Sequence, residues 1–587
     1  MSMFDLSSLS SAAAQDVSDA PVLDETSFRL GAYRDGSVVK FRGLVRDVQD
    51  PEFVQLGGET RPPTDATDLI ERVPLIVTIF PHATDWTQQA YCKVPQLTRS
   101  DGRCRQSEGL ALSKGIKRSS AAVNEPVTNG VGQKTDELNN KKTKAVDKDE
   151  DVPKKVEGAT DWLPSPAISA YVYDGHYKDV PIDAFKVNEA FEFVGILDLT
   201  VPSLGTKGDA WKDVLSVEQI EELQISDCIE QVQGKKDQGS VVLHCCHVSS
   251  LESVQYVRPH ESREFYEQIK HSNDSRSTFC RDEWAKLGHE MDVAAMRKQL
   301  LDYLTLAVGG DMLAAEYLLL GLLSHVYSRA DPSTPLGNLS LNLSLDKSLV
   351  DERKQEFIAR VYETLVLLMP MVVQVDLSLE ELNSSRYKPY KDYDREALVS
   401  GVLQVANGTT MLVNETALTA GQLNDQGVKN VAALQSLVEK MLLPYDFQYY
   451  DMDFSQDVVI VTVSEGSTIL PVTVAVPIVS TNSTTANIQS SSLPEDQLFE
   501  CFRLFLCVLR SSIVTIRNEE AEMAEKHYVE CRKSQQKVVL DDLHRWLRLA
   551  RLMALSRGEG NISKDSWNAM LMLETERVAR LAAEKSS

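Results

Sequence analysis

The sequence predicts an α+β protein with several domains: β-rich modules come first, an α/β domain follows, and a helical bundle ends the chain. The β-rich part is indicated by alternating apolar and polar residues, as in the segments 39–48 and 185–197. The α/β part is indicated by helix and strand patterns that take turns along residues 291–495. A chain of 587 residues is long enough for roughly three or four domains with separate cores.

The predicted boundaries follow changes in composition. Ser, Ala and Asp dominate the start of the chain, and polar and charged residues dominate a long internal segment, so both are expected to be disordered. The predicted parts are a disordered N-terminus (1–27), a β-rich module (28–97), a disordered charged linker (98–160), a second β-rich module or a continuation of the first (161–259), a connector (260–290), an α/β domain (291–495) and a helical domain (496–587).

Composition narrows the class of protein. A net charge of −25 argues against a protein that wraps nucleic acid unaided, because phosphate binding draws its affinity from Lys and Arg; an acidic chain instead favours a basic partner surface. Nine scattered cysteines with no even framework indicate reduced thiols in the cytosol or nucleus. Residues 1–20 show no secretory signal, and the apolar run from Met312 to Tyr327 falls short of the ~20 residues of a membrane span, so no membrane association is expected.

Two short clusters contain residue types that often carry function. The run from His244 to His247, which reads His-Cys-Cys-His, contains zinc-ligand types, but adjacent residues of a strand point to opposite faces and cannot converge on one ion. No metal site is therefore predicted. The basic runs 114–118 and 141–144 in the linker are either a nuclear import address or solvated patches of a flexible segment.

Periodicity predicts several helices and strands. In the first half, strands are predicted at 39–48, where Gly43 permits a bend or bulge, and at 74–80, 170–173, 185–197 and 241–248. A helix is predicted from apolar residues at helical spacing, which are Met296, Leu300, Leu301, Leu304 and Ala307. Beyond it, strands are predicted at 339–343, 371–377 and 458–464, and a helix at 357–369.

A glycine turn, Gly309-Gly310-Asp311, opens the most apolar predicted helix. In nucleotide-binding loops such a turn points backbone N–H groups at phosphate, and a Lys followed by Ser or Thr then holds phosphate and Mg²⁺. Here Glu316 and Tyr317 occupy those two places, and a carboxylate repels a triphosphate. The stretch is therefore either a nucleotide loop that has lost its chemistry or a turn before a core helix.

A second candidate is the pair Asn414-Glu415, which ends a predicted apolar strand. In nucleotide hydrolases the corresponding strand ends in Asp-Glu; the Asp orients Mg²⁺ and the Glu positions the attacking water. Asn414 is uncharged, whereas Glu415 is retained. The pair is either a damaged catalytic pair or the end of a core strand that enters a turn.

Longer segments carry a family resemblance. The chain closely resembles the eukaryotic minichromosome maintenance (MCM) complex-binding protein family in the runs VVKFRGLVRDVQDPEF, AVGGDMLAAEYLLLGLLSHVYSRADPSTPLGNLSLNLS and YKPYKDYDREALVSGVLQVANGTTMLVNETALTAGQLNDQGVKNVAAL. The same segments are similar to the MCM helicases, which are AAA+ ATPases. The resemblance implies OB-like β-rich modules, a degenerate AAA+-like α/β domain and a C-terminal helical lid-like bundle. An apolar stripe at Leu543, Leu547, Ala550 and Ala554 predicts a helical bundle on its own.

The resemblance also assigns the altered positions. Gly310-Asp311 lies where the helicases carry Gly-Asp-Pro, and Asp541 lies where they place an arginine that reaches a neighbour's ATP. No catalytic residue, cofactor or metal is expected. The degenerate nucleotide-site positions are Gly310, Asp311, Glu316, Tyr317, Asn414, Glu415 and Asp541.

The implied function is a non-catalytic binding partner of MCM helicase subunits. It would regulate the assembly, supply or removal of the helicase during DNA replication, support sister-chromatid cohesion and reach chromatin through MCM, in the nucleus and with a cytoplasmic pool left open. Direct DNA binding is not expected. Two alternatives stay open: a divergent AAA+ ATPase, which would rest on Glu415 and the glycine turn, and a single-strand-binding β module, with which Phe41, Arg42, Arg46 and Phe53 are compatible.

Overall fold

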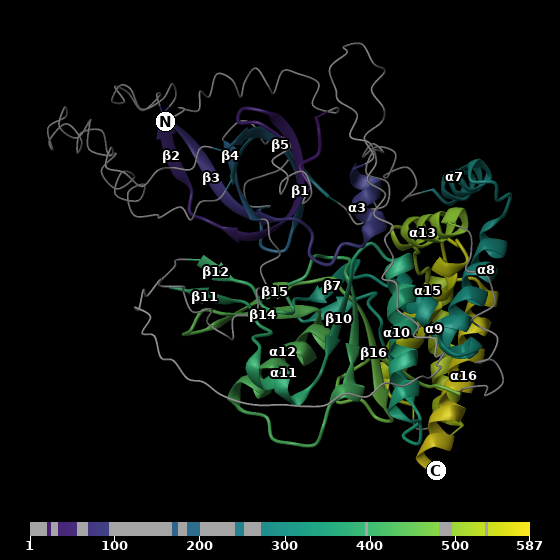
Figure 1. Ribbon diagram of the computed structural model, residues 1–587. Helices are drawn as coiled ribbons and strands as arrows, with labels where there is room; N and C mark the ends of the chain where they lie inside the picture. The colour runs from purple at the N-terminus through teal and green to yellow at the C-terminus, as the bar shows by residue number, and fades with distance from the viewer. Residues whose placement is uncertain are drawn as a thin grey trace, which may run out of the picture. The chain divides into compact units, whose positions relative to one another are not determined.

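The structure is a computed structural model of the chain, shown in Figure 1. The described residues are 20–24, 33–55, 69–92, 167–173, 185–199, 241–251, 272–393, 397–479, 496–534 and 538–586. The predicted linker with its two basic runs lies outside them, as does most of the predicted N-terminal segment.

Six strands of the N-terminal half form one sheet that closes on itself. They are β1 (Val38–Val48), β2 (Glu52–Gln55), β3 (Leu69–Thr78), β4 (Ala167–Tyr173), β5 (Ala190–Asp198) and β6 (Val241–Ser250), in the order β1-β5-β6-β4-β3-β2. An additional antiparallel pairing of β1 with β3 closes a ring through β1, β3, β4, β6 and β5. The strands predicted at 28–97 and 161–259 therefore share one sheet. The segment 161–259 continues the first β-rich module and is not a separate second module.

Gly43 lies beside β3, directly before the first residue pair of β1 and β3, Leu44 with Thr78. A Cβ atom at this position would lie 2.4 Å from Val77 Cγ1 and 2.7 Å from the Thr78 carbonyl oxygen, so only glycine fits without displacing the neighbouring strand. A register shift between Val45 and Asp47 adds a bulge to β1, and a bulge increases local twist. Both features help β1 to bend enough for the ring to close.

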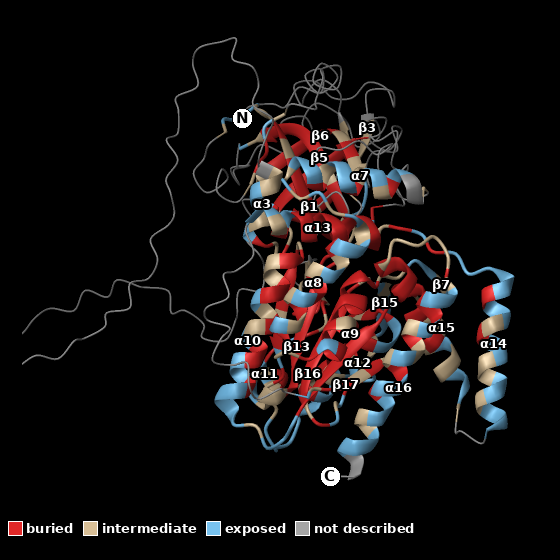
Figure 2. Ribbon diagram, turned by 90° about the vertical axis from the view of Figure 1, so that its right-hand side faces the viewer, coloured by how far each residue is buried: buried red, intermediate tan, exposed pale blue. Residues whose placement is uncertain are grey.

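Five parallel strands form the second large sheet. They are β9 (Ser340–Leu345), β10 (Val372–Asp376), β13 (Thr410–Asn414), β16 (Val459–Glu465) and β17 (Val474–Pro477), in the order β10-β13-β16-β9-β17. Alternate side chains bury both faces: on β13, Leu412 joins one hydrophobic cluster and Met411 and Val413 join another. Figure 2 shows β13, β16 and β17 almost entirely buried.

Helices cover both faces of this sheet (Figure 1). The Leu412 face shares its core with α7 (Asn273–Lys286), α8 (Val293–Ala307), α9 (Met312–Leu323), α10 (Asp351–Leu368), α13 (Asp496–Arg510), α14 (Asn518–Lys533), α15 (Leu540–Ser556) and α16 (Lys564–Ser586). The opposite face shares its core with α11 (Leu379–Ser384) and α12 (Asp425–Lys440). The helices predicted for residues 496–587 are thus present, but they pack into the core of the sheet.

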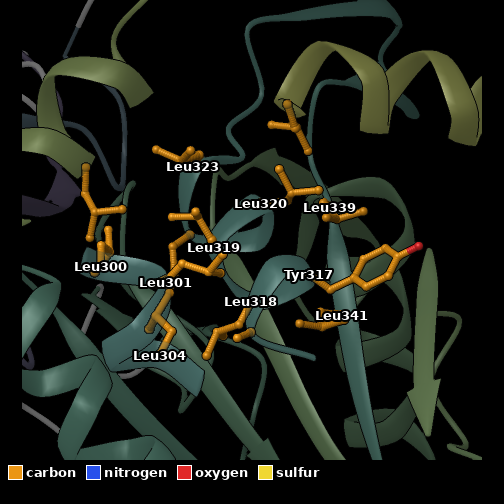
Figure 3. Packing of buried hydrophobic residues seen from close by; sticks show 14 of the residues in the cluster. Leu300, Leu301, Leu304, Tyr317, Leu318, Leu319, Leu320, Leu323, Leu339 and Leu341 are labelled. Carbon is orange, nitrogen blue, oxygen red and sulfur yellow. The ribbon is translucent and has the colours of Figure 1, made fainter. Parts of the chain in front are cut away.

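The predicted helix before the glycine turn is confirmed as α8, whose buried residues are Met296, Leu300, Leu301, Leu304 and Ala307. This helix and α9 bury leucines against the sheet, as Figure 3 shows. Within the described ranges, no single helix is long and apolar enough to span a membrane, and only α8 and α9 taken together pass that test, with a bend of 115° between them.

Two smaller sheets complete the fold. A four-stranded sheet has the order β12-β11-β14-β15 and contains β11 (Tyr390–Asp392), β12 (Ala397–Val399), β14 (Leu442–Asp446) and β15 (Asp451–Ser455). A hairpin is made by β7 (Ser328–Asp331) and β8 (Thr334–Leu336). A short helix, α3 (Asp85–Cys92), follows β3, and the Trp86 indole nitrogen of this helix donates a hydrogen bond to the Val366 carbonyl of α10 at 2.9 Å.

Candidate functional site

The glycine turn joins two helices. Gly309 and Gly310 have φ values of +76° and +89°, in the left-handed region that favours glycine. The Gly310 N–H donates to the Thr305 carbonyl at 2.8 Å, which closes the C-terminus of α8 as helix-ending glycines do. A phosphate loop of the type considered above instead joins a strand to a helix. This geometry favours the second interpretation of the stretch, a turn before a core helix, because the glycines end one helix so that another can begin.

Asp311 occupies the N-terminus of α9 with its own carboxylate. One oxygen accepts hydrogen bonds from the backbone N–H groups of Leu313 and Ala314, at 3.0 and 3.2 Å. The other accepts from the Val479 N–H at 2.9 Å and from the Arg580 guanidinium at 2.5 Å. The N–H groups that would face a phosphate are therefore already satisfied, and the cation that would attract it is already paired.

Glu316 and Tyr317 have structural partners. The Arg297 guanidinium of α8 donates to both carboxylate oxygens of Glu316, at 3.1 and 2.5 Å. Tyr317 is fully buried, and its hydroxyl donates to Glu574 of α16 at 2.6 Å. Burial and the Glu574 charge both raise the pKa of this phenol, so it stays protonated. Figure 3 shows the Tyr317 ring within the buried cluster, with its hydroxyl pointing away from the labelled leucines.

Glu574 anchors a buried charge network between α9, α15 and α16. Arg577 donates to its two oxygens at 2.7 and 2.9 Å, and Arg545 donates at 3.0 Å. Burial alone would raise the pKa of Glu574, but the hydrogen bonds and charge of Arg577, with the Tyr317 hydroxyl and Arg545, lower it below the ordinary value. Tyr317, which stands in the place of a Mg²⁺-binding Ser, is thus part of a contact that packs α9 against α16.

Asn414 is the last residue of β13, at the carboxyl edge of the parallel sheet, and Glu415 follows it directly. The Asn414 amide donates to Asp376 of the neighbouring strand at 2.7 Å, and its oxygen accepts from the Thr416 N–H at 3.0 Å. Glu415 accepts from the Thr468 hydroxyl at 2.5 Å and from the backbone N–H of Ile469 at 3.2 Å. Burial raises the pKa of Glu415 more than these hydrogen bonds lower it.

The altered positions do not form one constellation. Asp541 is exposed in the first turn of α15, whereas Asp311, Glu316 and Tyr317 pair with residues of α8 and α16. Within the described part of the chain, no hydrogen bond or ion pair joins any of them to Asn414, whose side-chain partners are Asp376 and Thr416. The structure therefore places the positions that the resemblance grouped together in three separate environments.

The topology points to another location for a ligand. In an open parallel sheet, ligands bind beyond the carboxyl ends of the strands where the strand order reverses. That point is β9, because the chain leaves it for the far edge at β10 and later sets β17 on its other side. A phosphate loop would therefore occupy the connection from β9 to α10, which is the segment 346–350.

The segment 346–350 lacks the chemistry of a phosphate loop. Its sequence, Asp-Lys-Ser-Leu-Val, contains no glycine and is shorter than the eight-residue glycine-rich pattern. Asp346 is exposed and accepts a hydrogen bond from the Ser348 N–H of the same segment at 2.8 Å. Sequence analysis did not single out this connection, although it predicted the strand before it and the helix after it.

Charges around the same segment disfavour a triphosphate. Lys354 of α10 is buried and donates to Asp351 at 3.0 Å and to Glu465 of β16 at 2.7 Å. The first turn of α10 carries Asp351 and Glu352, and its N-cap, Val350, provides no side-chain hydrogen bond. Carboxylates thus occupy the helix terminus where an anion would bind, and the buried lysine is neutralised by them.

The His-Cys-Cys-His run lies on β6, and its side chains alternate. Cys245 belongs to the cluster inside the ring and Cys246 to the cluster on the other face. His244 Nδ1 lies 2.6 Å from the Tyr173 hydroxyl, and burial lowers the pKa of this imidazole to about 4. Among the residues that the structure describes, no group of three or more His, Cys, Asp or Glu side chains could hold a metal ion.

The residues compatible with single-strand binding do not form a platform. Phe41 is buried inside the ring, and the buried Arg46 donates to the Gln404 carbonyl at 2.9 Å. Arg42 is buried as well and pairs with Glu192 at 2.7 Å. Of the four, only Phe53 is exposed, at 44%. Stacking of bases needs exposed aromatic rings along a cationic groove, which these side chains do not provide.

Comparison with known proteins gives a consistent result. Residues 57–581 match the family model described as mini-chromosome maintenance replisome factor. The chain is 29% identical to the Mini-chromosome maintenance complex-binding protein of Salmo salar, over 94% of this chain and 89% of that protein. It is 28% identical to the protein of that name from Arabidopsis thaliana, over 96% and 91% of the two chains, and 32% identical to that from Gallus gallus, over 69% and 61%.

Proposed function

The chain belongs to the family of mini-chromosome maintenance replisome factors, and we propose that it is a non-catalytic binding partner of the MCM helicase subunits. The observation that carries the proposal is the name shared by relatives from a fish, a bird and a plant, each an MCM complex-binding protein. In this proposal, binding regulates the assembly, supply or removal of the helicase during DNA replication and supports sister-chromatid cohesion. It takes place in the nucleus, and the chain reaches chromatin through MCM.

The architecture supports a partner that resembles its target. A five-strand closed ring supports an OB-like assignment of the N-terminal part. A parallel sheet with helices on both faces, followed by C-terminal helices, supports an AAA+-like part with a lid-like extension. A chain of this kind would occupy a position like that of a helicase subunit without hydrolysing ATP.

The non-catalytic part of the proposal is supported by what fills the nucleotide positions. Asp311 caps α9, Glu415 accepts hydrogen bonds from its own chain, and the segment 346–350 has no glycine. The divergent ATPase hypothesis rested on Glu415 and the glycine turn, and both have structural roles here. Phosphoryl transfer depends on electrostatic stabilisation of the phosphates, which carboxylates at these places oppose.

Affinity purification of the full chain from nuclear extract tests the proposal. The extract is divided, and ATP is removed from one half with apyrase. We expect MCM subunits in the eluate of both halves in similar amounts, because binding would not pass through a nucleotide on this chain. An eluate without any MCM subunit would overturn the proposed function, and ATP turnover by the purified chain alone would overturn its non-catalytic part.

A further inference from the structure

The hairpin of β14 and β15 carries an exposed aromatic tip. Tyr449 is 90% exposed, Tyr450 56% and Met452 45%, and every residue from 448 to 453 is exposed. Large apolar side chains grouped on a surface indicate an interaction site more often than single ones do. The tip therefore needs an explanation that core packing does not give.

The turn at this tip is held in one shape. Gln448 has a φ of +64°, a left-handed conformation that is strained for a residue other than glycine. Asp446 accepts the Gln448 N–H at 2.8 Å, and the rings of Phe447 and Tyr450 stack in parallel at 5.3 Å. A strained residue fixed by its neighbours indicates a shape that is kept for a purpose.

The base of the hairpin is anchored in the fold. Tyr445 is fully buried, and its ring lies 4.3 Å from that of Phe454 on the opposite strand. The Tyr445 hydroxyl accepts a hydrogen bond from the Asn188 amide at 2.7 Å. The exposed tip is thus presented by a rigid base, which lowers the conformational entropy that the hairpin loses on binding.

One face of the hairpin is acidic. Asp446 lies directly opposite Asp451, and Asp453 follows two residues later on the same face of β15. Like charges directly opposite each other destabilise a strand pair. Lys388 pairs with Asp451 at 2.7 Å and neutralises one of the three carboxylates. The face keeps an excess of negative charge that the hairpin itself does not require.

The outer edge of β15 offers backbone groups for pairing. Among the described strands, β15 pairs only with β14 and ends its sheet. Hydrogen bonds from Phe447 to Tyr450 and from Gln456 to Met441 fix the alternation along the hairpin. By this alternation the N–H and C=O groups of Asp451, Asp453 and Ser455 point away from β14.

We propose that the β14–β15 hairpin is a docking site for a basic, extended segment of an MCM subunit, which adds as a strand to the free edge of β15. Main-chain hydrogen bonds to β15 would supply affinity, as in other cases of strand addition. Lys or Arg side chains of the segment would lie over Asp451 and Asp453, and an apolar side chain would contact Tyr449 and Met452. The inference rests on the proposed function for the identity of the partner.

Charge selects this partner over the other occupants of an exposed edge. A second copy of this chain would set the same carboxylates against each other, and charged edge residues are a known barrier to such self-pairing. A nucleic acid would place phosphates against the same face, where no described cation other than Lys388 is paired with the hairpin carboxylates. A basic extended segment would gain main-chain hydrogen bonds from the edge of β15 and electrostatic attraction from the carboxylates of the hairpin.

A photo-cross-linking experiment with the full chain tests the site. Tyr449→benzoylphenylalanine is introduced, and Met572→benzoylphenylalanine, at a 75% exposed position of α16, is the matched control. Both variants are mixed with purified MCM subunits and irradiated. We expect an MCM cross-link from position 449 and not from 572, with a Lys- or Arg-rich peptide attached.

Substitutions at Asp453 test the charge and the free edge of β15. Asp453→Lys reverses the charge and keeps the backbone N–H, whereas Asp453→Pro removes both the charge and an outward N–H that β14 does not use. Glu525→Lys, exposed on α14, is the control with the same change in net charge. Each Asp453 variant should weaken MCM binding by about tenfold, the scale of truncating a contact at an interface. The control should leave it unchanged.

The outcomes separate this inference from the proposed function. If MCM subunits bind the wild-type chain but position 449 gives no cross-link to them and Asp453→Lys binds as tightly as wild type, the hairpin is not the site and the proposed function stands. A cross-link from position 449 to a second copy of this chain would also overturn the inference. If wild-type chain binds no MCM subunit, the proposed function fails, and this inference fails with it.

Discussion

Two turns open helices beside the parallel sheet, and they divide the features of a nucleotide loop between them. The turn 309–311 has the glycines, but it follows α8 and its Asp311 fills the N-terminus of α9. The connection 346–350 follows β9, at the point where the strand order reverses, but it has no glycine. The first turn has glycines but no preceding strand, and the second follows a strand but has no glycine. Neither turn therefore has the features needed to bind a phosphate.

The difference teaches that local residue patterns and topology must coincide before a loop acquires a function. Glycine after a helix and an Asp before the next helix satisfy capping requirements on their own. The same glycines and Asp, placed after a parallel strand, would instead lie at the carboxyl edge of a sheet, where ligands bind. Substitutions at Tyr317, at Glu316 and at the two buried carboxylates Glu574 and Glu415 test this difference, and the expected effects decrease in that order.

The largest loss of stability is expected from substitution of Tyr317, which is buried where α9 packs against α16. Tyr317→Ala should lower the free energy of unfolding by about 4 kcal/mol, because it removes a buried aromatic ring and leaves a cavity. Tyr317→Phe, the control, should cost about 1 kcal/mol, since only the hydrogen bond to Glu574 is lost. Urea unfolding measures both. A loss below that of the control in Tyr317→Ala would show that the ring is not part of the core.

A smaller effect is expected from Glu316→Lys, which supplies the lysine of a phosphate loop to the glycine turn. The variant should lose about 2 kcal/mol of stability, because it replaces a half-buried ion pair with two cations, and it should show no ATP turnover. The double variant with Arg297→Glu restores opposite charges and should recover part of the loss. Measurable ATP turnover in the single variant would refute the structural role of this turn.

The smallest effect concerns acid stability, where Glu574 and Glu415 differ in sign. The pKa of Glu574 is lowered from 4.5, so its stabilising contribution is complete above that pH and is lost as the pH falls through its lower folded value. The pKa of Glu415 is raised, so its ionised form costs stability that is regained as the pH falls below the raised value. Urea unfolding as a function of pH should therefore show a shallower loss in acid for Glu574→Gln and a steeper one for Glu415→Gln. The same response in both variants would contradict the assigned networks.

Sequence patterns predicted much of this fold because each depends on near neighbours. The five buried positions of α8 follow from helical spacing, and β1, β9 and β16 follow from runs of alternating or apolar residues. The family resemblance was confirmed by the match over residues 57–581. The assignments of the β-rich part as OB-like, of the α/β part as AAA+-like and of the C-terminal helices as lid-like belong to the proposed function.

What the sequence could not supply were pairings between distant segments. The partner of Tyr317 is Glu574, and the partner of Asp311 is Arg580, each more than two hundred residues away in the chain. Ring closure by β1 and β3 and the free edge of β15 also depend on which strands pair. The candidate site was therefore predicted from the residue types at 309–317. Its role depends on the order of the strands in the parallel sheet, which those residue types do not reveal.

The central claim is that this chain keeps a parallel sheet with a reversal point at β9 but has no nucleotide site there or at the glycine turn. Equilibrium titration of the full chain with a fluorescent ATP analogue in the presence of Mg²⁺ tests it most directly. We expect no saturable change in anisotropy up to concentrations at which nucleotide hydrolases are filled. Saturable binding in the micromolar range, reversed by unlabelled ATP, would contradict the account.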